Sequence, residues 1–306
     1  MSDLQYVTDT YLLMGTVVSI QAVSRTEADV VQCAIARAFD AMCFVEETCS
    51  RFNEHSALRE LCRHPEQSMQ VPDVLFETLR IALEMSVLTD GAFDPTIGAT
   101  LEANGFNRDY LTGNVVQSDI ASTEPVSYRD ITLDEANHTV LLQKPMLLDL
   151  GAVAKGLAVD LAARELAECD GFAIDAGGDL YLHGVDPTGD EWTVGIQHPL
   201  EKERMICFLR ATNVAVCTSG SYERKSPLKR NKHHLIHPKT GDSITGLLSC
   251  TVIAPLAILA DAVSTAAFVL GADRALEFVE SLELPALCIS DTLDVTMTHA
   301  MERYLT

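Results

Sequence analysis

One stretch of the chain, Leu147 to Leu182, constrains the fold more than any other. It predicts a short strand over Leu147–Leu150, a turn through Gly151–Gly156 that carries Lys155, and then a helix whose apolar side chains recur at helical spacing. A strand, a glycine-flanked turn with a lysine, and a helix N-terminus are the parts from which phosphate sites are made, because backbone N–H groups and the positive helix end attract an anion. The stretch therefore indicates a site for a phosphate-bearing ligand.

The same stretch ends in two apolar runs, 172–176 and 180–182, which Gly177 and Gly178 separate. These glycines would let the backbone approach a flat ligand where a side chain would collide. The alternative is an ordinary βαβ unit with glycines only in its turns. The stretch contains neither GxxxxGK[ST] nor GxGxxG, so neither familiar nucleotide motif decides between the two interpretations.

Net charge limits the partners of the protein. Its 306 residues include 22 basic and 44 acidic side chains, a formal charge of -22 at pH 7, which argues against nucleic acid or an anionic membrane surface as the main partner. An anionic ligand would need a local positive site or a metal ion. The nine cysteines include no CxxC pair, and the first twenty residues have no basic leader, so we expect a cytoplasmic protein without a membrane anchor.

The first half of the chain predicts mostly core elements. A strand over 11–23 contains Met14-Gly15-Thr16, where the glycine indicates a bulge or the close approach of a ligand. Asp94 precedes a proline, which disfavours the α conformation and places its carboxylate on an extended, rigid segment. The other expected features are helices over 27–48 and 72–89, an irregular surface segment over 97–126, and a strand pair over 131–133 and 139–143.

The second half predicts more strands and two helices. A helix over about 258–270 places Asp261 and Thr265 one turn apart on one face, where their oxygens could ligate a hard cation such as Mg²⁺ or simply face water. The predicted strand over 214–224 contains Thr218-Ser219-Gly220, where the hydroxyl of Ser219 could face a ligand. The other expected features are a mobile basic loop over 225–232, a helix over 274–282, and strands over 192–197, 205–209, 214–224, 249–254, 286–290 and 295–298.

Three histidines, His233, His234 and His237, lie within five residues. If 233–238 is a strand, neighbouring side chains point to opposite faces, which argues against a zinc site made of three histidines. One histidine that acts as a base is the better functional interpretation.

Eight motifs in a fixed order resemble the ApbE family of FAD:protein FMN transferases: MGT, SRFNEHSAL, GAFDPT, DLGAVAKG, AGGDL, TSGSYER, HHLIHPKTG and ADAVSTAAF. The resemblance covers nearly the whole chain. It implies a single α+β domain over residues 1–306, with two intimately packed lobes of the ApbE or T-fold-like type and a flavin cleft between them. It also implies Mg²⁺-dependent transfer of FMN from FAD to a threonine or serine hydroxyl of an acceptor protein, with release of AMP.

The resemblance carries residue roles with it. It implies that His234 acts near the acceptor hydroxyl as the catalytic residue, and that Asp261, Thr265 and the backbone carbonyl of Ala152 hold the metal. Together with the glycine turns and Ser219, it gives a set of expected flavin contacts: Met14, Phe52, Ala92, Phe93, Asp94, Asp149, Lys155, Gly177, Gly178, Ser219, Leu235 and Ile236.

One position departs from the family pattern, because His237 stands where the family usually has an aspartate. If that aspartate is catalytic or orients another group, the reaction would be slow or altered. Two alternatives therefore stay open. The first is an FAD pyrophosphatase, in which water replaces the acceptor hydroxyl. The second is a flavin-binding protein without transfer activity.

Overall fold

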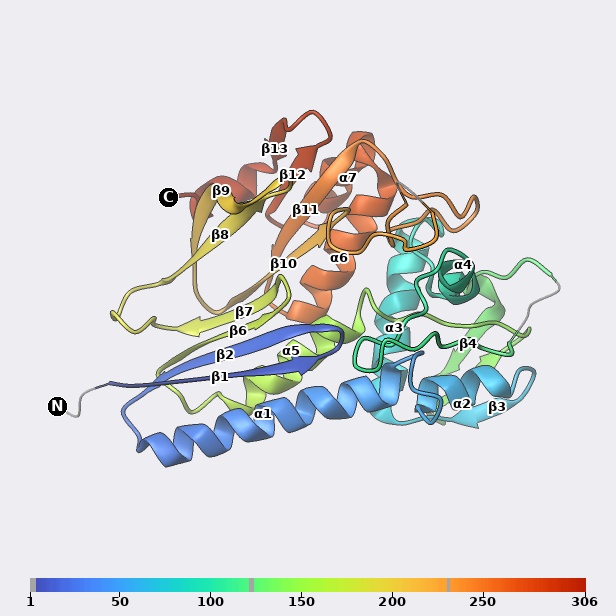
Figure 1. The fold of residues 1–306 in the computed structure, drawn as a ribbon, viewed down its shortest axis with the longest axis horizontal. Helices are drawn as coiled ribbons and strands as arrows, with labels where there is room; N and C mark the ends of the chain where they lie inside the picture. The colour runs from blue at the N-terminus through green and yellow to red at the C-terminus, as the bar shows by residue number, and fades with distance from the viewer. Residues whose placement is uncertain (1–3, 121–123, 230–231) are drawn as a thin grey trace.

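An antiparallel sheet of eight strands organises the computed structural model, which describes residues 4–120, 124–229 and 232–306 (Figure 1). The strand order is β1-β2-β6-β7-β10-β11-β12-β13, and every neighbouring pair is antiparallel. The strands are β1 (Gln5–Leu13), β2 (Thr16–Ser24), β6 (Gly171–Ala176), β7 (Asp179–Gly184), β10 (Val214–Gly220), β11 (Leu247–Ala254), β12 (Ala286–Ser290) and β13 (Val295–Met297). The predicted α+β class is confirmed.

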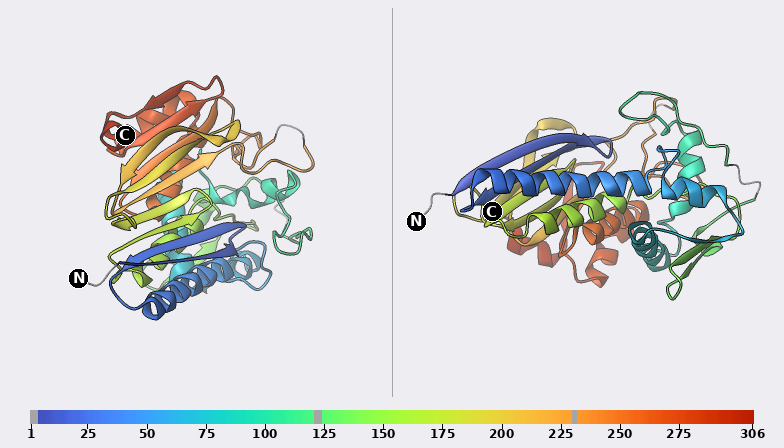
Figure 2. Two further views of the ribbon diagram at one scale, coloured as in Figure 1. Left: turned by 60° about the vertical axis from the view of Figure 1, so that its left-hand side comes forward. Right: turned by 90° about the horizontal axis from the view of Figure 1, so that it is seen from below.

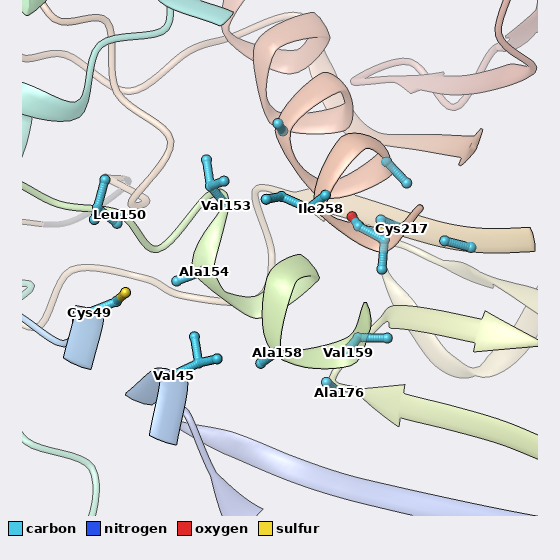
Figure 3. Packing of buried hydrophobic residues seen from close by; sticks show 14 of the residues in the cluster. Val45, Cys49, Leu150, Val153, Ala154, Ala158, Val159, Ala176, Cys217 and Ile258 are labelled. Carbon is cyan, nitrogen blue, oxygen red and sulfur yellow. The ribbon is translucent and has the colours of Figure 1, made fainter. Parts of the chain in front are cut away.

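Helices cover one face of this sheet, in the order α1, α5, α6, α7 (Figure 2). They are α1 (Ala28–Cys49), α5 (Ala154–Glu165), α6 (Ala257–Leu270) and α7 (Ala272–Ser281). The apolar stripe of α1, which includes Ile35, Met42 and Val45, is fully buried, as its helical spacing predicts. In Figure 3, Ala154 and Ala158 of α5 lie near Val45 of α1. Small side chains on α5 therefore allow the helices to pack closely.

A hairpin of two strands, β8 (Trp192–His198) and β9 (Glu201–Ala211), encloses a second core. Trp192 and Ile196 of β8 pack there with Val216 and Ile253 of the large sheet. The indole Nε1 of Trp192 donates a hydrogen bond of 2.8 Å to the carbonyl of His183. The hairpin was predicted as two strands, and both are confirmed.

A smaller lobe is built on a sheet of three strands in the order β3-β5-β4. Its longest helix, α3, also contacts α1 and α6 of the larger lobe, so the two lobes share one core. Ser56 caps α2 by accepting a hydrogen bond from the N–H of Arg59. The elements of this lobe are α2 (Ala57–Arg63), β3 (Ser68–Gln70), α3 (Asp73–Leu88), η1 (Pro95–Ile97), α4 (Gly98–Ala103), η2 (Tyr128–Asp130), β4 (Ile131–Asp134) and β5 (Thr139–Leu142). A last 3₁₀ helix, η3 (His299–Tyr304), lies against β9 and β12 of the larger lobe.

The predicted strand over 11–23 is wrong, because the chain reverses at Met14-Gly15. Leu13 pairs with Thr16, and the two residues between them have φ angles of 52° and 75°. Two residues with positive φ make the tight turn whose twist matches that of antiparallel strands. The glycine therefore belongs to a hairpin turn and not to a bulge.

The predicted strand over Leu147–Leu150 is also wrong, although the segment is mostly buried. It makes backbone hydrogen bonds with the segment 95–98 instead: the N–H of Gly98 donates to the carbonyl of Leu147 (3.1 Å), and the N–H of Asp149 donates to the carbonyl of Pro95 (2.8 Å). Because β6 is antiparallel to both of its neighbours, the βαβ interpretation is excluded as well.

The helix after this segment begins earlier than predicted, so that Lys155 and Gly156 lie in the first turn of α5. A Cβ on Gly156 would lie 2.4 Å from the carbonyl oxygen of Ala257. The glycine is therefore required by the contact between α5 and α6, and a phosphate is not needed to explain it.

Two segments near the histidines differ from expectation. Residues 233–238 are not a strand, since with the other described residues they make only the isolated pairs Lys225–His233 and Ile236–Ser243. The described part of the basic loop is anchored on the smaller lobe, where Lys229 Nζ lies 2.7 Å from the side-chain oxygen of Asn104. The predicted irregular segment 97–126 starts with the helix α4.

Some expectations cannot be compared with the structure. Residues 121–123 and 230–231 of the predicted segments, and the first three residues, lie outside the described ranges. Within those ranges, no helix combines the length and apolar character that a membrane crossing requires. The cytoplasmic location stays a prediction.

Candidate active site

Lys155, in the first turn of α5, forms an ion pair with Asp179, the first residue of β7. The side chain of Lys155 is 19% exposed and that of Asp179 is 3% exposed. Burial alone would lower the pKa of Lys155, but the carboxylates of Asp179 and Asp261 outweigh it, and the pKa is raised. Lys155 is therefore charged and paired with Asp179. The sequence had predicted a lysine whose ammonium is free to bind a phosphate.

Asp261 is a buried carboxylate on α6, and its Oδ2 accepts a hydrogen bond of 3.1 Å from the backbone N–H of Gly156. Burial, and then the charge of Asp179, raises its pKa to about 8. Two carboxylates thus share the single ammonium of Lys155. A proton or a cation at Asp261 would balance the charge of this buried cluster.

Thr265 lies on the same side of α6, one turn further along. Its Oγ1 is 2.8 Å from the hydroxyl of Ser219 on β10, which is also 3.0 Å from the hydroxyl of Ser264. Asp261 and Thr265 are both buried, so the alternative that this pair simply faces water is wrong. The predicted pair and Ser219 are brought together by the packing of α6 against β10.

The oxygens in this region suit a hard cation. Among the described residues, no group of three or more His, Cys, Asp or Glu side chains could hold a metal ion. A cation would therefore depend on the carboxylate of Asp261 with neutral oxygens such as those of Thr265 and Ala152. Ala152 lies in the turn just before α5. Mg²⁺ keeps several waters and accepts one or two carboxylates, so Asp261 and Thr265 fit it, and the carbonyl of Ala152 stays a predicted ligand.

Asp149 pairs with a buried arginine that the sequence analysis did not assign. Burial would raise the pKa of Asp149, but the adjacent guanidinium of Arg51 holds it below its usual value. Arg51 also donates to the carbonyl of Phe106, and its guanidinium lies 4.2 Å from the centre of the Phe52 ring. Asp149 and Phe52, two predicted flavin contacts, are thus joined by one arginine.

Asp94 uses both of its carboxylate oxygens inside the protein. Oδ1 accepts from the N–H (2.9 Å) and hydroxyl (2.8 Å) of Thr96, and Oδ2 accepts from the N–H of Tyr128 (3.1 Å). Burial raises its pKa. Its backbone is extended, as the following proline predicted. These bonds explain the carboxylate without a ligand, and its contact with a flavin stays a prediction.

The other predicted flavin contacts differ in how accessible they are. Met14 and Ala92 are half-buried, whereas Phe93, Leu235 and Ile236 are buried. Leu235 accepts a backbone bond from Ile244 (3.1 Å). A flavin contact at these positions stays a prediction.

The two neighbouring histidines lie in different surroundings. His233 Nε2 is 2.8 Å from the carbonyl of Ile244, and its ring packs edge-on against Phe268 of α6. The ring of His234 lies edge-on to Phe106. Burial, and then the charge of Arg224, lowers the pKa of His234 to about 3, so its imidazole is neutral near pH 7. The two rings thus have different aromatic neighbours, and the expectation that they point to opposite faces stays a prediction.

His237, the departure from the family pattern, has a structural function. Its Nδ1 accepts a hydrogen bond of 3.2 Å from the N–H of Lys239, two residues further on. An aspartate commonly makes the same bond to the backbone in a turn. The histidine therefore supplies the acceptor that an aspartate would supply here.

Gly177 and Gly178, which directly precede Asp179 in the chain, lie beside a cavity of about 410 Å³ that Trp192, Gln197 and Tyr222 also line. Gly177 has a φ of 67°, and a Cβ there would lie 2.2 Å from the hydroxyl of Thr16. That glycine is explained by the protein's own packing. A Cβ on Gly178 would have free space around it, since the nearest atom, the carbonyl oxygen of Thr218, is 4.0 Å away. A ligand contact at Gly178 stays a prediction.

Sequence reasoning missed three charged residues of the site: Arg51, Asp179 and Arg224. Arg51 and Arg224 were quoted in the motifs SRFNEHSAL and TSGSYER, and Asp179 in AGGDL. These three residues could have been found from their position, because each lies in a motif that also contains a predicted flavin contact. The pairing of Arg51 with Asp149 and of Asp179 with Lys155 could not be predicted, because the partners are distant in the chain.

The fold and the cluster define an α+β protein with a candidate site for a phosphorylated ligand and a hard cation. Residues 14–288 match the ApbE family. The chain belongs to that family.

Similar proteins include two named FAD:protein FMN transferase. The one from Salmonella typhimurium is 34% identical over 221 residues, 68% of this chain and 63% of the relative. The one from Treponema pallidum is 32% identical over 289 residues, 86% of this chain and 78% of the relative. Thus the match spans slightly under two thirds of the Salmonella protein.

Solved structures agree with the fold. The ApbE protein of Thermotoga maritima has a TM-score of 0.87 and 27% identity, covering 99% of this chain and 100% of that chain. The flavin transferase ApbE of Vibrio cholerae has a TM-score of 0.83 and 24% identity, covering 99% and 100%.

Proposed function

We propose that this chain transfers FMN from FAD to a threonine or serine hydroxyl of an acceptor protein, with Mg²⁺, and releases AMP. The observation that carries the proposal is the buried cluster of Lys155, Asp179 and Asp261 at the first turn of α5. A pyrophosphate needs cationic and N–H groups, and the carboxylate of Asp261 needs a cation, so one bound cation would serve both at this point. Membership of the ApbE family and the names of the relatives support the proposal.

Different residues of the site would bind the cation, the phosphoryl groups and the flavin nucleotide. Asp261, Thr265 and the carbonyl of Ala152 would hold Mg²⁺, which when bound supplies Lewis-acid stabilisation of charge on the pyrophosphate. Lys155 would orient phosphoryl oxygens while it stays paired with Asp179. Phe52 and Asp149, held by Arg51, would line the flavin nucleotide site.

The transfer itself is a substitution at phosphorus. The acceptor hydroxyl gives its proton to the neutral imidazole of His234, and its oxygen bonds to the phosphorus of the FMN half. The bond from that phosphorus to the bridging oxygen breaks, and AMP leaves with the bridging oxygen. The products are an FMN phosphoester on the acceptor and AMP.

The test is mass spectrometry of candidate acceptor proteins after incubation with the protein, FAD and Mg²⁺. The proposal expects the acceptor to gain FMN less one water, in equal amount to the AMP released. Release of FMN and AMP with an unmodified acceptor would instead identify an FAD pyrophosphatase. Recovery of intact FAD from a protein that binds it would identify a flavin-binding protein without transfer activity.

A further inference from the structure

Arg224 follows the end of β10, and its guanidinium lies over the turn between β1 and β2. Its Nη2 is 3.5 Å from the position that a Cβ on Gly15 would occupy, and the ring of Tyr110 lies beside the same position. Gly15 has a φ of 75° in the hairpin turn. Because this turn has no side chain there, the guanidinium can rest against its backbone.

The guanidinium lies among the residues of the candidate active site. Its charge acts on four groups from three segments of the chain, lowering the pKa of each: Asp149, Lys155, His234 and Asp261. The carbonyl of Arg224 also accepts the backbone N–H of His234 at 3.3 Å. Arg224 is thus positioned between the flavin contacts, the cation ligands and the candidate base.

Arg224 differs from the other cations of the site in having no carboxylate. Lys155 is paired with Asp179 and Arg51 with Asp149. Over the ranges 4–120, 124–229 and 232–306, the Arg224 side chain makes no hydrogen bond or ion pair, and the residue is exposed. In a protein of charge -22, such an unpaired guanidinium is a strong local attraction for an anion.

We propose that Arg224 is the principal anion-binding residue of this site and that its guanidinium binds phosphoryl oxygens of a pyrophosphate. This inference rests on the proposed function and names a contact that the sequence analysis had expected of Lys155. A guanidinium offers several N–H donors in a planar fork that matches two phosphoryl oxygens, which an ammonium cannot do.

The placement of Arg224 also has a consequence for the base. His234 with a pKa of about 3 is a weak base in the free protein. An anion bound to Arg224 would offset the positive charge that disfavours protonation of the imidazole. Binding of the pyrophosphate would therefore make His234 more basic at the stage when it must accept a proton.

The test compares FAD binding, followed by flavin fluorescence with Mg²⁺ present, in the wild type and three variants. Arg224→Gln removes the guanidinium, Arg224→Lys keeps the charge without the fork, and Lys225→Gln removes one charge from the adjacent exposed position. Inorganic pyrophosphate, added as a competitor, probes the phosphate contact without the flavin. Thermal unfolding checks that each variant is folded.

We expect Arg224→Gln to weaken both FAD and pyrophosphate binding by about 10- to 100-fold, the range for a charge-assisted hydrogen bond. Arg224→Lys should fall between Arg224→Gln and the wild type, and Lys225→Gln should match the wild type. Equal effects of Arg224→Gln and Lys225→Gln would overturn the inference, because only general charge would then be involved. Unchanged FAD and pyrophosphate binding with weaker use of an acceptor would also overturn it, and would assign Arg224 to the acceptor protein. If the wild type itself binds no FAD, the proposed function fails first.

Discussion

Asp160 on α5 and Asp261 on α6 each accept hydrogen bonds from the first turn of the other helix. Asp160 accepts from the N–H groups of Ala257 (2.7 Å) and Ile258 (2.9 Å), and Asp261 accepts from that of Gly156 (3.1 Å). The two carboxylates therefore fix the N-terminal ends of both helices against each other. Only Asp261 also belongs to the charged cluster with Lys155 and Asp179, so the two positions are a matched pair for separating structure from ligand binding.

Asp261→Asn should abolish the cation response while leaving the fold intact. The amide oxygen can still accept from Gly156, and a carboxylate whose pKa is raised to about 8 costs little to replace by a neutral group. The cation, however, loses its charged ligand. We expect Mg²⁺ to raise the melting temperature of the wild type and not that of Asp261→Asn, with most FMN transfer lost. Full transfer by Asp261→Asn at low Mg²⁺ would show that the metal assignment is wrong.

Asp160→Asn is the control for this experiment. Both of its oxygens cap α6, and an amide offers only one acceptor, so we expect a loss of about 1–2 kcal/mol in the free energy of unfolding. The Mg²⁺ response should remain, because Asp160 has no place among the expected cation ligands. Loss of that response in both variants would mean that it reports helix packing instead of a cation site.

The accuracy of the sequence predictions depended on whether a pattern was local. The helix predicted over 27–48 rests on the spacing of near neighbours, and it was correct to within one residue at each end. Leu147–Leu150 is apolar and buried like a strand, but its partners are in the 95–98 segment, which no spacing rule could name. The charged pairs of the site could not be predicted for the same reason, since Arg51 and Asp149 are 98 residues apart in the chain. The order of the motifs predicted which segments form the site, whereas the pairing of its charged side chains was seen only in the folded structure.

Lys155→Met should destabilise the protein because it leaves Asp179 buried without its partner. Removing one member of a buried ion pair typically costs about 3–5 kcal/mol. Adding Asp179→Asn to the same chain should restore much of that loss, since the carboxylate of Asp179 is then removed and Asp261, whose pKa is already raised to about 8, can stay protonated. Urea unfolding of the two single variants and the double variant measures the coupling. If the double variant is as unstable as the sum of the single ones, the pair contributes nothing specific.

His237→Asp should leave transfer and stability unchanged, because an aspartate can accept the N–H of Lys239 as His237 does. His237→Ala has no acceptor for this turn and should lower the free energy of unfolding by about 0.5–1.5 kcal/mol. Thermal unfolding and FMN transfer by the two variants distinguish the cases. A large gain of transfer in His237→Asp would show instead that the family aspartate has a chemical function that the histidine replaces poorly.

His234→Ala should lose FMN transfer by about 10²- to 10⁴-fold, the usual contribution of a positioned base, while FAD binding is kept. His233→Ala removes the bond to the carbonyl of Ile244 and should cost about 1–3 kcal/mol of stability with little effect on transfer. Acceptor mass and FAD titration are followed in parallel. Equal losses of transfer in both variants, or loss of FAD binding in His234→Ala, would assign His234 a structural function.

Acid stability should depend on the same pair of imidazoles. Burial and the charge of Arg224, with smaller effects of His233 and Lys155, lower the pKa of His234 to about 3, and burial lowers that of His233. An unfolded histidine has a pKa of about 6.5. Between these pH values the unfolded chain binds protons at these histidines that the folded chain does not bind. The free energy of unfolding therefore decreases as the pH falls below about 6.5. Above that pH the two imidazoles are neutral in both states and add no pH dependence.

His234→Gln should therefore weaken the loss of stability in acid, because glutamine takes up no proton. Urea unfolding at about pH 7.5 and about pH 5 gives the difference between wild type and variant at each pH. Asp94, Asp160 and Asp261, whose pKa values burial raises, shift stability in the opposite direction. They are present in both proteins and cancel in that difference. The wild type should lose more stability than His234→Gln between the two pH values. An equal loss would mean that His234 titrates normally in the folded protein, and the buried, neutral imidazole required of the base would not exist.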